Sequence, residues 1–384
     1  MTPSGAKTGS NAEWGQDVLA GDAGNQWAPA WQRETPDPCG GDWRGELKDA
    51  IRSGKELCER LAIRRSRHSD EATAERDFPV LAPPFFVSKM RRGDPRDPLF
   101  LQVAAAAEET LDVPGFSRDP VGEADLAGAP ENGVHPAPAL LKKYAGRALL
   151  MPTAACAVHC RYCFRRHYPY GERGVNTAGV AAALDAIAAD QTIREVILSG
   201  GDPLTLADTS LEELAGQIAR IPHVTRLRVH TRLPVVIPSR VTDGLLAALT
   251  ATRLTPIMVV HANHPREICE TVAAAIGRIV GAGVPTLNQS VLLKGINDDA
   301  DTLTELCQRL VNAKAMPYYL HQLDRVAGAA HFEVEEARGR GLIEQLRTRL
   351  AGYAVPRYVR EVVGKGSKIP VGERPRSQAG YEQL

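Results

Sequence analysis

Apolar and polar positions divide the chain into two parts with different patterns. From residue 147 onward, short apolar runs alternate with Ala- and Leu-rich segments of helical periodicity. This alternation predicts an α/β fold in which helices cover a parallel sheet, closed or partly closed into a barrel. Strands are predicted at 148–152, 195–199, 226–230, 256–261, 284–292 and 316–321, and helices at 177–190, 209–220, 240–250, 265–281, 300–313 and 333–351.

The chain before residue 147 lacks this alternation. Apolar residues between 47 and 61 recur at helical spacing, but prolines and turn residues interrupt the passage that follows. Residues 1–42 are rich in Gly, Pro, Asp and Ser and predict a disordered arm. The expected regions are an arm at 1–42, a helical cap at 43–146, a barrel at 147–355 and a C-terminal segment at 356–384.

Composition narrows the classes of function. The 384 residues include 46 Lys and Arg and 46 Asp and Glu, so no overall charge attracts nucleic acid or anionic lipid. No segment approaches the roughly 20 apolar residues that cross a bilayer, and the N-terminus lacks a signal-peptide core. We therefore expect a cytoplasmic protein. The seven cysteines, three of them clustered, favour a reducing compartment and a metal site, with Cys39, Cys58, Cys269 and Cys307 as core or surface thiols.

The clustered cysteines follow the first predicted strand. Cys156, Cys160 and Cys163 have C-x3-C-x2-C spacing, which can surround a metal but cannot form a disulfide without strain. A structural zinc normally takes four protein ligands, whereas an iron–sulfur cluster with three leaves one iron open for a substrate or cosubstrate. A zinc knuckle or three buried core thiols are the alternatives. Because barrel enzymes carry their chemistry at the carboxyl ends of strands, we expect the site there.

Polar residues and glycines end other predicted strands. Ser199, Gly200, Gly201 and Asp202 close the second strand, where bare backbone can hold a carboxylate and Asp202 can bind an ammonium. The same sequence also suits an ordinary strand-to-helix turn. A lone histidine such as His230 is more often structural, but several strands ending at one mouth favour a site. On this argument we also expect Gln289 and Arg147 to contact a ligand.

A glycine-rich loop near the C-terminus carries two lysines. In the loop 364–370, glycines let the backbone approach a phosphate, and Lys368 could form a Schiff base with pyridoxal phosphate (PLP). A flexible, solvated turn is the alternative.

Seven motifs follow one another between about residue 80 and residue 372: Cys-Arg-Tyr-Cys-Phe-Arg-Arg from Cys160, Leu-Ser-Gly-Gly-Asp-Pro from Leu198, Leu-Pro-Val-Val-Ile-Pro from Leu233, Asn-Gln-Ser-Val-Leu-Leu from Asn288, Pro-Tyr-Tyr-Leu-His from Pro317, Gly-Tyr-Ala-Val-Pro from Gly352 and Ser-Lys-Ile-Pro from Ser367. This combination resembles the lysine 2,3-aminomutase family of radical S-adenosylmethionine (SAM) enzymes. The resemblance implies a partial (β/α)6 barrel. It also implies that a 5′-deoxyadenosyl radical removes hydrogen from C3 of an amino acid, whose amino group then moves from C2 to C3.

The resemblance also implies cofactors and residue roles. The three cysteines would hold a [4Fe-4S] cluster, SAM would occupy its open iron, and PLP would be bound to Lys368. An electron donor such as flavodoxin or ferredoxin is implied, and a homo-oligomer is compatible. For the remaining sites, the resemblance gives Arg165 for the substrate carboxylate, Asp324 and Glu361 for the distal ammonium, Arg147, Gln289 and His230 around the cofactors, Tyr162 near the adenine, and Ser199, Gly200, Gly201 and Asp202 for the SAM methionine.

Two features distinguish branches of the family. Glu361 stands where enzymes of free lysine have a second aspartate, and the sequence ends 16 residues after Lys368 without late cysteines. In both respects the chain resembles the bacterial branch that makes (R)-β-lysine for elongation factor P. The alternatives are an aminomutase acting on free lysine or another amino acid in a metabolic pathway, a radical SAM enzyme without PLP, and a non-catalytic iron–sulfur protein that kept the fold.

Overall fold

The computed structural model describes residues 41–64, 69–126 and 137–372, all within one compact unit of the chain. Nearly all of the predicted arm, and Cys39, lie outside the described residues. Among the residues described, no helix has the length and apolar character needed to cross a bilayer.

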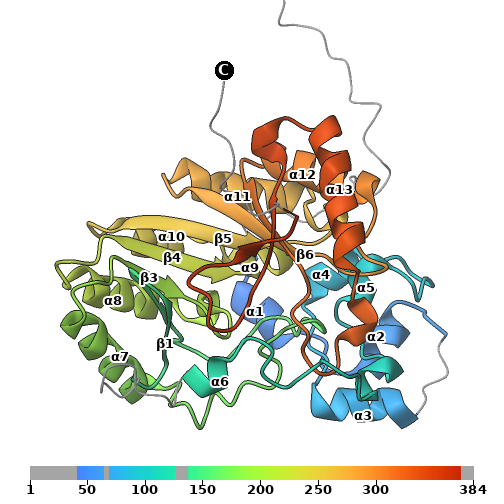
Figure 1. The fold of residues 1–384 in the computed structure, drawn as a ribbon, viewed down its shortest axis with the longest axis horizontal. Coiled ribbons are helices and arrows are strands. Elements are labelled where there is room, and N and C mark those ends of the chain that lie inside the picture. The colour runs from blue at the N-terminus through green and yellow to red at the C-terminus, as the bar shows by residue number, and fades with distance from the viewer. Residues whose placement is uncertain (1–40, 65–68, 127–136, 373–384) are drawn as a thin grey trace, which may run out of the picture. The chain divides into compact units, whose positions relative to one another are not determined.

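The centre of the described unit is a single sheet whose strands neighbour one another in sequence order (Figure 1). The strands from the second to the eighth are parallel, and the first and last strands pair antiparallel with their neighbours. The strands are β1 (Leu140–Tyr144), β2 (Arg147–Leu150), β3 (Glu195–Leu198), β4 (Arg226–Thr231), β5 (Thr255–His261), β6 (Thr286–Val291), β7 (Met316–His321), β8 (Arg357–Arg360) and β9 (Ile369–Pro370).

All six predicted strands are present, and the sheet extends beyond them at both ends. β1 lies in the predicted cap, and β8 and β9 lie in the predicted C-terminal segment. β8 continues the parallel sheet beside β7, but only its two central residues are buried. β1 carries consecutive lysines and buries only Leu141. Neither strand is long or apolar enough for its pattern to predict it.

The helices that connect the parallel strands pack on the sheet, and three of the six begin with a polar cap residue. Asn176, Thr242 and Asp299 each accept a hydrogen bond from a first-turn backbone N–H. Proline-led turns precede two helices, which therefore begin later than predicted. These helices are α7 (Thr177–Ala189), α8 (Asp208–Ala219), α10 (Asp243–Thr250), α11 (Glu270–Gly281), α12 (Ala300–Asn312) and α13 (Glu336–Arg349), with α9 (Leu233–Val236) and the turns η3 (Pro203–Thr205), η4 (Pro238–Arg240), η5 (Pro265–Glu267), η6 (Ala330–Phe332) and η7 (Gly352–Ala354) between them.

Short helices form the cap and share one hydrophobic core with the barrel. Trp43, Ile51 and Phe100 belong to the same buried cluster as Leu150 of β2 and Val229 of β4. The cap is therefore packed against the sheet as part of the same folding unit. Its helices are α1 (Trp43–Lys48), α2 (Gly54–Arg60), α3 (Ser69–Asp77), α4 (Pro84–Ser88), α5 (Pro98–Leu101), η2 (Ala107–Thr110) and α6 (Glu123–Leu126).

Side chains connect the two edges of the sheet. The Tyr144 hydroxyl at the end of β1 donates a hydrogen bond to Glu361, which directly follows β8, and Lys143 Nζ lies 3.7 Å from the same carboxylate. The sheet therefore curves until its first and last parallel regions meet. It is a partial barrel, as predicted.

Candidate active site

The cysteine loop after β2 is anchored to the cap by buried charges. The Arg161 guanidinium is fully buried and donates to both oxygens of Glu109, from Nε at 2.8 Å and from Nη2 at 2.5 Å. Arg166 Nη2 donates to the same Glu109 carboxylate at 2.7 Å. One carboxylate thus bridges two arginines on either side of Cys163, which fixes the course of the loop.

The three thiols lie close enough to influence one another. Burial and the neighbouring Cys160 raise the pKa of the Cys163 thiol to about 11. Burial, Cys163, Asp202 and Cys160 raise the pKa of Cys156 above its usual range. Within the described part of the chain, no three His, Cys, Asp or Glu residues are close enough to hold a single metal ion. The donor set suits an iron–sulfur cluster, whose iron would supply the positive charge that ionises buried thiols.

Cys160 is connected to a buried polar network. Its Sγ accepts a hydrogen bond from Arg232 Nη1 at 2.7 Å, and that nitrogen lies 2.9 Å from the Tyr162 hydroxyl. Arg232 also pairs with Glu267 at 2.8 Å. Tyr162 is buried, and its ring stacks on His261 with centroids 5.7 Å apart. Its predicted contact with an adenine remains a prediction.

The glycine turn after β3 closes against the cysteine loop. A Cβ on Gly201 would lie 2.5 Å from the Ala155 carbonyl oxygen, and one on Gly200, whose φ is +109°, would lie 2.7 Å from Met151 Cγ. The glycines are therefore needed for close packing of two loops, a role that the sequence did not predict. Asp202 is buried and accepts from Thr231 Oγ1 at 2.7 Å and from the backbone N–H of Arg232 at 2.7 Å.

Lys368 precedes β9 at the other edge of the sheet. Its Nζ donates to Glu361 Oε2 at 2.8 Å. Burial alone would raise the pKa of Glu361, but Lys368, Tyr144 and Lys143 hold it below its usual value. The Glu361 carboxylate is therefore ionised and fixes the position of the lysine amine.

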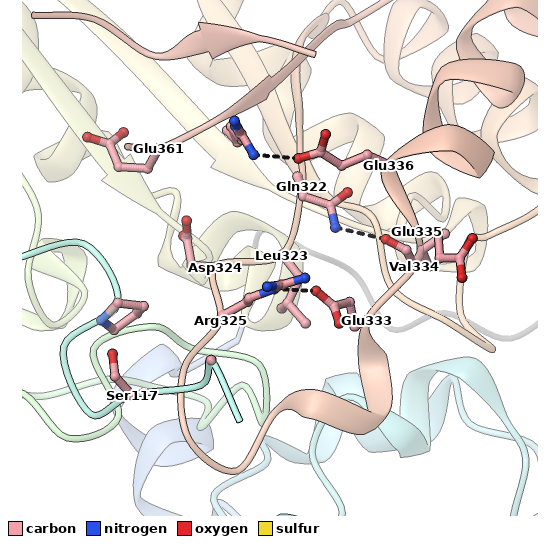
Figure 2. Close-up of a pocket in the computed structure, with 13 residues that line it drawn as sticks. Ser117, Gln322, Leu323, Asp324, Arg325, Glu333, Val334, Glu335, Glu336 and Glu361 are labelled. Carbon is pink, nitrogen blue, oxygen red and sulfur yellow. Dashed lines mark hydrogen bonds and ion pairs between the residues drawn. The ribbon is translucent and has the colours of Figure 1, made fainter. Parts of the chain in front are cut away.

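Asp324 follows β7 and lines a pocket of about 450 Å³ together with Glu361 (Figure 2). Its carboxylate has no hydrogen bond or ion pair with any other described residue, in contrast to Glu333, which pairs with Arg325 at 2.7 Å. Burial, only partly offset by Lys368 and reinforced by Glu361, raises the pKa of Asp324 to about 7. A cation placed beside Asp324 would restore its ionised form.

Arg165 lies two residues after Cys163 and is buried. Its Nε and Nη2 donate to Glu123 of α6 at 2.6 and 2.9 Å, and its Nη1 donates to Ser199 Oγ at 3.2 Å. Lys143 Nζ lies 3.2 Å from Glu123. Together with the Lys143–Glu361 and Glu361–Lys368 contacts, this gives a continuous path of ion pairs from the cysteine loop to Lys368.

His230 of β4 is half-buried and His321 of β7 is buried, and both lie within electrostatic reach of Lys368. Nε2 of His230 in β4 and Nε2 of His321 in β7 are buried and lack a hydrogen-bond partner in the described residues. Burial, Arg228, Lys368 and Arg165 lower the pKa of His230, and burial and Lys368 lower that of His321. Both rings are therefore neutral, and each has a nitrogen available to a ligand. Gln289 Nε2 lies 3.5 Å from His230 Nδ1. Two residues that were each predicted to contact a cofactor therefore lie side by side.

The structure joins three of the predicted residues, Arg165, Glu361 and Lys368, by ion pairs that run through Glu123 and Lys143. Arg147 begins β2, and its guanidinium lies 4.4 Å from the centroid of the Tyr144 ring. Four residues of this site were not predicted from the sequence: Glu123, Lys143, Tyr144 and His321. Glu123 lies in a stretch that reads as loop, and only its ion pairs reveal its importance. Lys143 and Tyr144 precede the first predicted strand, where two polar residues at a strand edge gave no distinct signal.

Comparisons with known proteins match this arrangement. Residues 150–307 match the model of the radical SAM superfamily, which covers the cysteine loop, the glycine turn and most of the parallel strands. The fold and site thus define a radical SAM enzyme, a class that uses a [4Fe-4S] cluster and SAM.

Full-length similarity identifies the family more narrowly. The chain is 43% identical to L-lysine 2,3-aminomutase of Haemophilus influenzae, over 86% of this chain and 96% of the relative. It is 42% identical to the Escherichia coli protein of the same name, over 88% of this chain and 96% of the relative, and 33% identical to that of Clostridium subterminale, over 86% and 77%. The chain belongs to the lysine 2,3-aminomutase family, whose members are isomerases.

A solved radical SAM methyltransferase from Sphaerobacter thermophilus covers 57% of this chain and 68% of its own, with 23% identity and a TM-score of 0.41. This likeness is too partial to support a further argument.

Proposed function

We propose that this enzyme converts L-lysine to β-lysine, the R isomer, for modification of elongation factor P, with PLP bound to Lys368. The observation that supports the proposal best is the path of ion pairs that joins the cysteine loop to Lys368 through Glu123 and Glu361. It brings the proposed cluster ligands and the proposed PLP lysine to one interior. A radical made at the cluster could then reach a substrate held at the lysine.

The cofactors have proposed ligands. Cys156, Cys160 and Cys163 would hold the cluster, with flavodoxin or ferredoxin as electron donor, and the turn from Ser199 to Asp202 would lie near SAM. The unpartnered Nε2 atoms of His230 and His321 and the exposed side of Lys368 suit a polar ring cofactor between β4 and β7. When bound there, PLP supplies an aldehyde that attaches the substrate amine and a ring that delocalises an unpaired electron.

The protein's own residues would bind and orient the substrate. Arg165 would hold the α-carboxylate through its terminal nitrogens. Asp324 and Glu361 would attract the distal ammonium, which converts the neutral Asp324 to its ionised form. Neutral His230, whose Nδ1 faces the Gln289 amide, can donate from Nε2 to a ligand without adding charge. The surrounding buried strands exclude water from the reacting atoms.

Glu361 stands where enzymes of free lysine have a second aspartate, and this resemblance to the elongation factor P branch supports the choice of product.

The test is to incubate the reconstituted, reduced enzyme anaerobically with SAM, PLP and a panel of amino acids, and to identify β-isomers by mass spectrometry. Borohydride reduction should attach PLP to Lys368. Lys368→Ala should lose the PLP label, and its turnover should fall by at least about 1,000-fold. Lys365→Ala, at an exposed position three residues away, should keep both the label and the turnover. The assignment is wrong if Lys368→Ala still turns over lysine with PLP. Transfer of the isolated product to elongation factor P tests its destination.

A further inference from the structure

We infer that Glu123 is a positioning residue that holds one edge of the Arg165 guanidinium and leaves the opposite edge to bind the α-carboxylate of the amino acid. The inference rests on the proposed function, because that function gives Arg165 its ligand. Glu123 itself does not touch the substrate.

The Glu123–Arg165 ion pair occupies one edge of the guanidinium. Glu123 Oε2 accepts from Arg165 Nε at 2.6 Å and Oε1 accepts from Nη2 at 2.9 Å, so the carboxylate binds the guanidinium from the side. A guanidinium has five N–H donors, of which Glu123 takes two. Ser199 Oγ takes one more from Nη1 at 3.2 Å. One donor remains on each terminal nitrogen, which is the pair that a second carboxylate can bind end-on.

Glu123 is itself fixed from two directions. Its backbone N–H donates to Asp119 Oδ1 at 2.9 Å, and Lys143 Nζ of β1 lies 3.2 Å from its carboxylate. Its side chain is 4% exposed and therefore has little contact with water. Arg165 and Lys143 outweigh the effect of burial and keep the pKa of Glu123 below its usual value, so the positioning group stays charged.

Loss of the Glu123 carboxylate would change the orientation of the bound substrate more than the affinity for it. Without Glu123, the Nε edge of Arg165 would become available, and the substrate carboxylate could bind from the side. Removal of a nearby negative charge would not weaken attraction for that carboxylate. The substrate would still bind, but C3 would be displaced from the radical, and displacements of about 1 Å can cost about 100-fold in rate.

This reasoning predicts a specific signature for Glu123→Gln. Formation of β-lysine should fall about 10- to 100-fold while the KM for lysine changes less than about threefold. SAM cleavage should become uncoupled, so the ratio of 5′-deoxyadenosine to β-lysine should rise about tenfold or more. A smaller fraction of folded enzyme would lower both products together and leave this ratio unchanged.

Two further variants keep the experiment decisive. Glu123→Asp retains the charge but is too short to span Nε and Nη2 in the same pose, so its product ratio should lie between the native and Glu123→Gln values. It also serves if Glu123→Gln fails to fold. Glu344→Gln removes an exposed ion pair with Arg347 on α13 and should leave the ratio unchanged.

A binding measurement separates this inference from the proposed function. Calorimetry should show that the native enzyme binds lysine more tightly than lysinamide, which lacks the carboxylate. Arg165→Gln should lose this difference in affinity, and Glu123→Gln should keep it. If Arg165→Gln keeps the difference, the proposed role of Arg165 is wrong. If Arg165→Gln loses it but Glu123→Gln and Glu123→Asp both show the native product ratio, the positioning role of Glu123 is wrong.

Discussion

The two ends of the active site are held by different kinds of contact. At the cysteine end, Arg161 and Glu109 have side-chain exposures of 0% and 1%, and Glu109 serves two arginines and the Ala106 backbone. At the lysine end, Lys368 is 28% exposed, and its one ion pair with a described residue is that with Glu361. The cysteine loop is thus fixed by buried charges within the common core of cap and barrel, whereas the lysine segment is held at the sheet edge by a few partly exposed groups.

This difference matches the demands on each end. A cluster must be held at a constant position for electron transfer, so a rigid loop suits it. In the proposed function Lys368 binds and releases a cofactor aldehyde, which requires the lysine to move, and a short segment between β8 and β9 can move without disturbing the core. We therefore expect mutations at the cysteine end to affect stability most and mutations at the lysine end to affect substrate handling.

The largest effect should come from Glu109→Gln. It leaves Arg161 and Arg166 buried without their full counter-charge, which should lower the free energy of unfolding by about 3–5 kcal/mol. Chemical denaturation of the purified protein measures this. Glu59→Gln, which removes an exposed pair with Lys55 at 3.8 Å, should change it by less than about 0.5 kcal/mol. Equal effects of the two variants would contradict the proposed contrast between buried and exposed anchoring.

The next largest effect should be a pH dependence of the KM for lysine. The pKa of Asp324 is raised to about 7, so the carboxyl is neutral below that pH, and in its proposed role it must ionise before it can bind the cationic lysine. The KM for lysine should therefore rise about tenfold for each pH unit below 7. The inhibition constant of norleucine, which has no distal ammonium, should not follow this curve. Asp324→Asn should abolish the dependence, and a native profile unaffected by that substitution would show that another group titrates.

The smallest effect should come from Tyr144→Phe. It removes the hydroxyl that joins β1 to Glu361 but leaves the contacts of Glu361 with Lys368 and Lys143. We expect a loss of about 1–2 kcal/mol in unfolding free energy and faster amide exchange confined to the segment 357–372. Tyr353→Phe, at a side chain 65% exposed, is the matched control and should show neither change. Uniformly faster exchange across the sheet would argue against a local link between its edges.

The sequence alone determined the parallel barrel and the chemistry of its most distinctive loop. Strand and helix periods are local properties, so all six predicted strands appeared within a few residues of their expected ends. The cysteine spacing is also local, because three thiols within eight residues share a loop in any fold. The resemblance to the lysine 2,3-aminomutase family, carried by ordered motifs, agrees with the full-length comparisons.

Only the tertiary structure decided how the groups pair and how the barrel is completed. β8 has four residues with exposed ends, so its place in the sheet depends on pairing with β7. The Glu123–Arg165 and Tyr144–Glu361 contacts join residues 42 and 217 positions apart. No periodicity indicates such partners, because these contacts join residues that are far apart in the sequence and form only after the chain has folded. The glycines after β3 show the same limit, since the atoms that exclude a side chain at Gly201 belong to the cysteine loop.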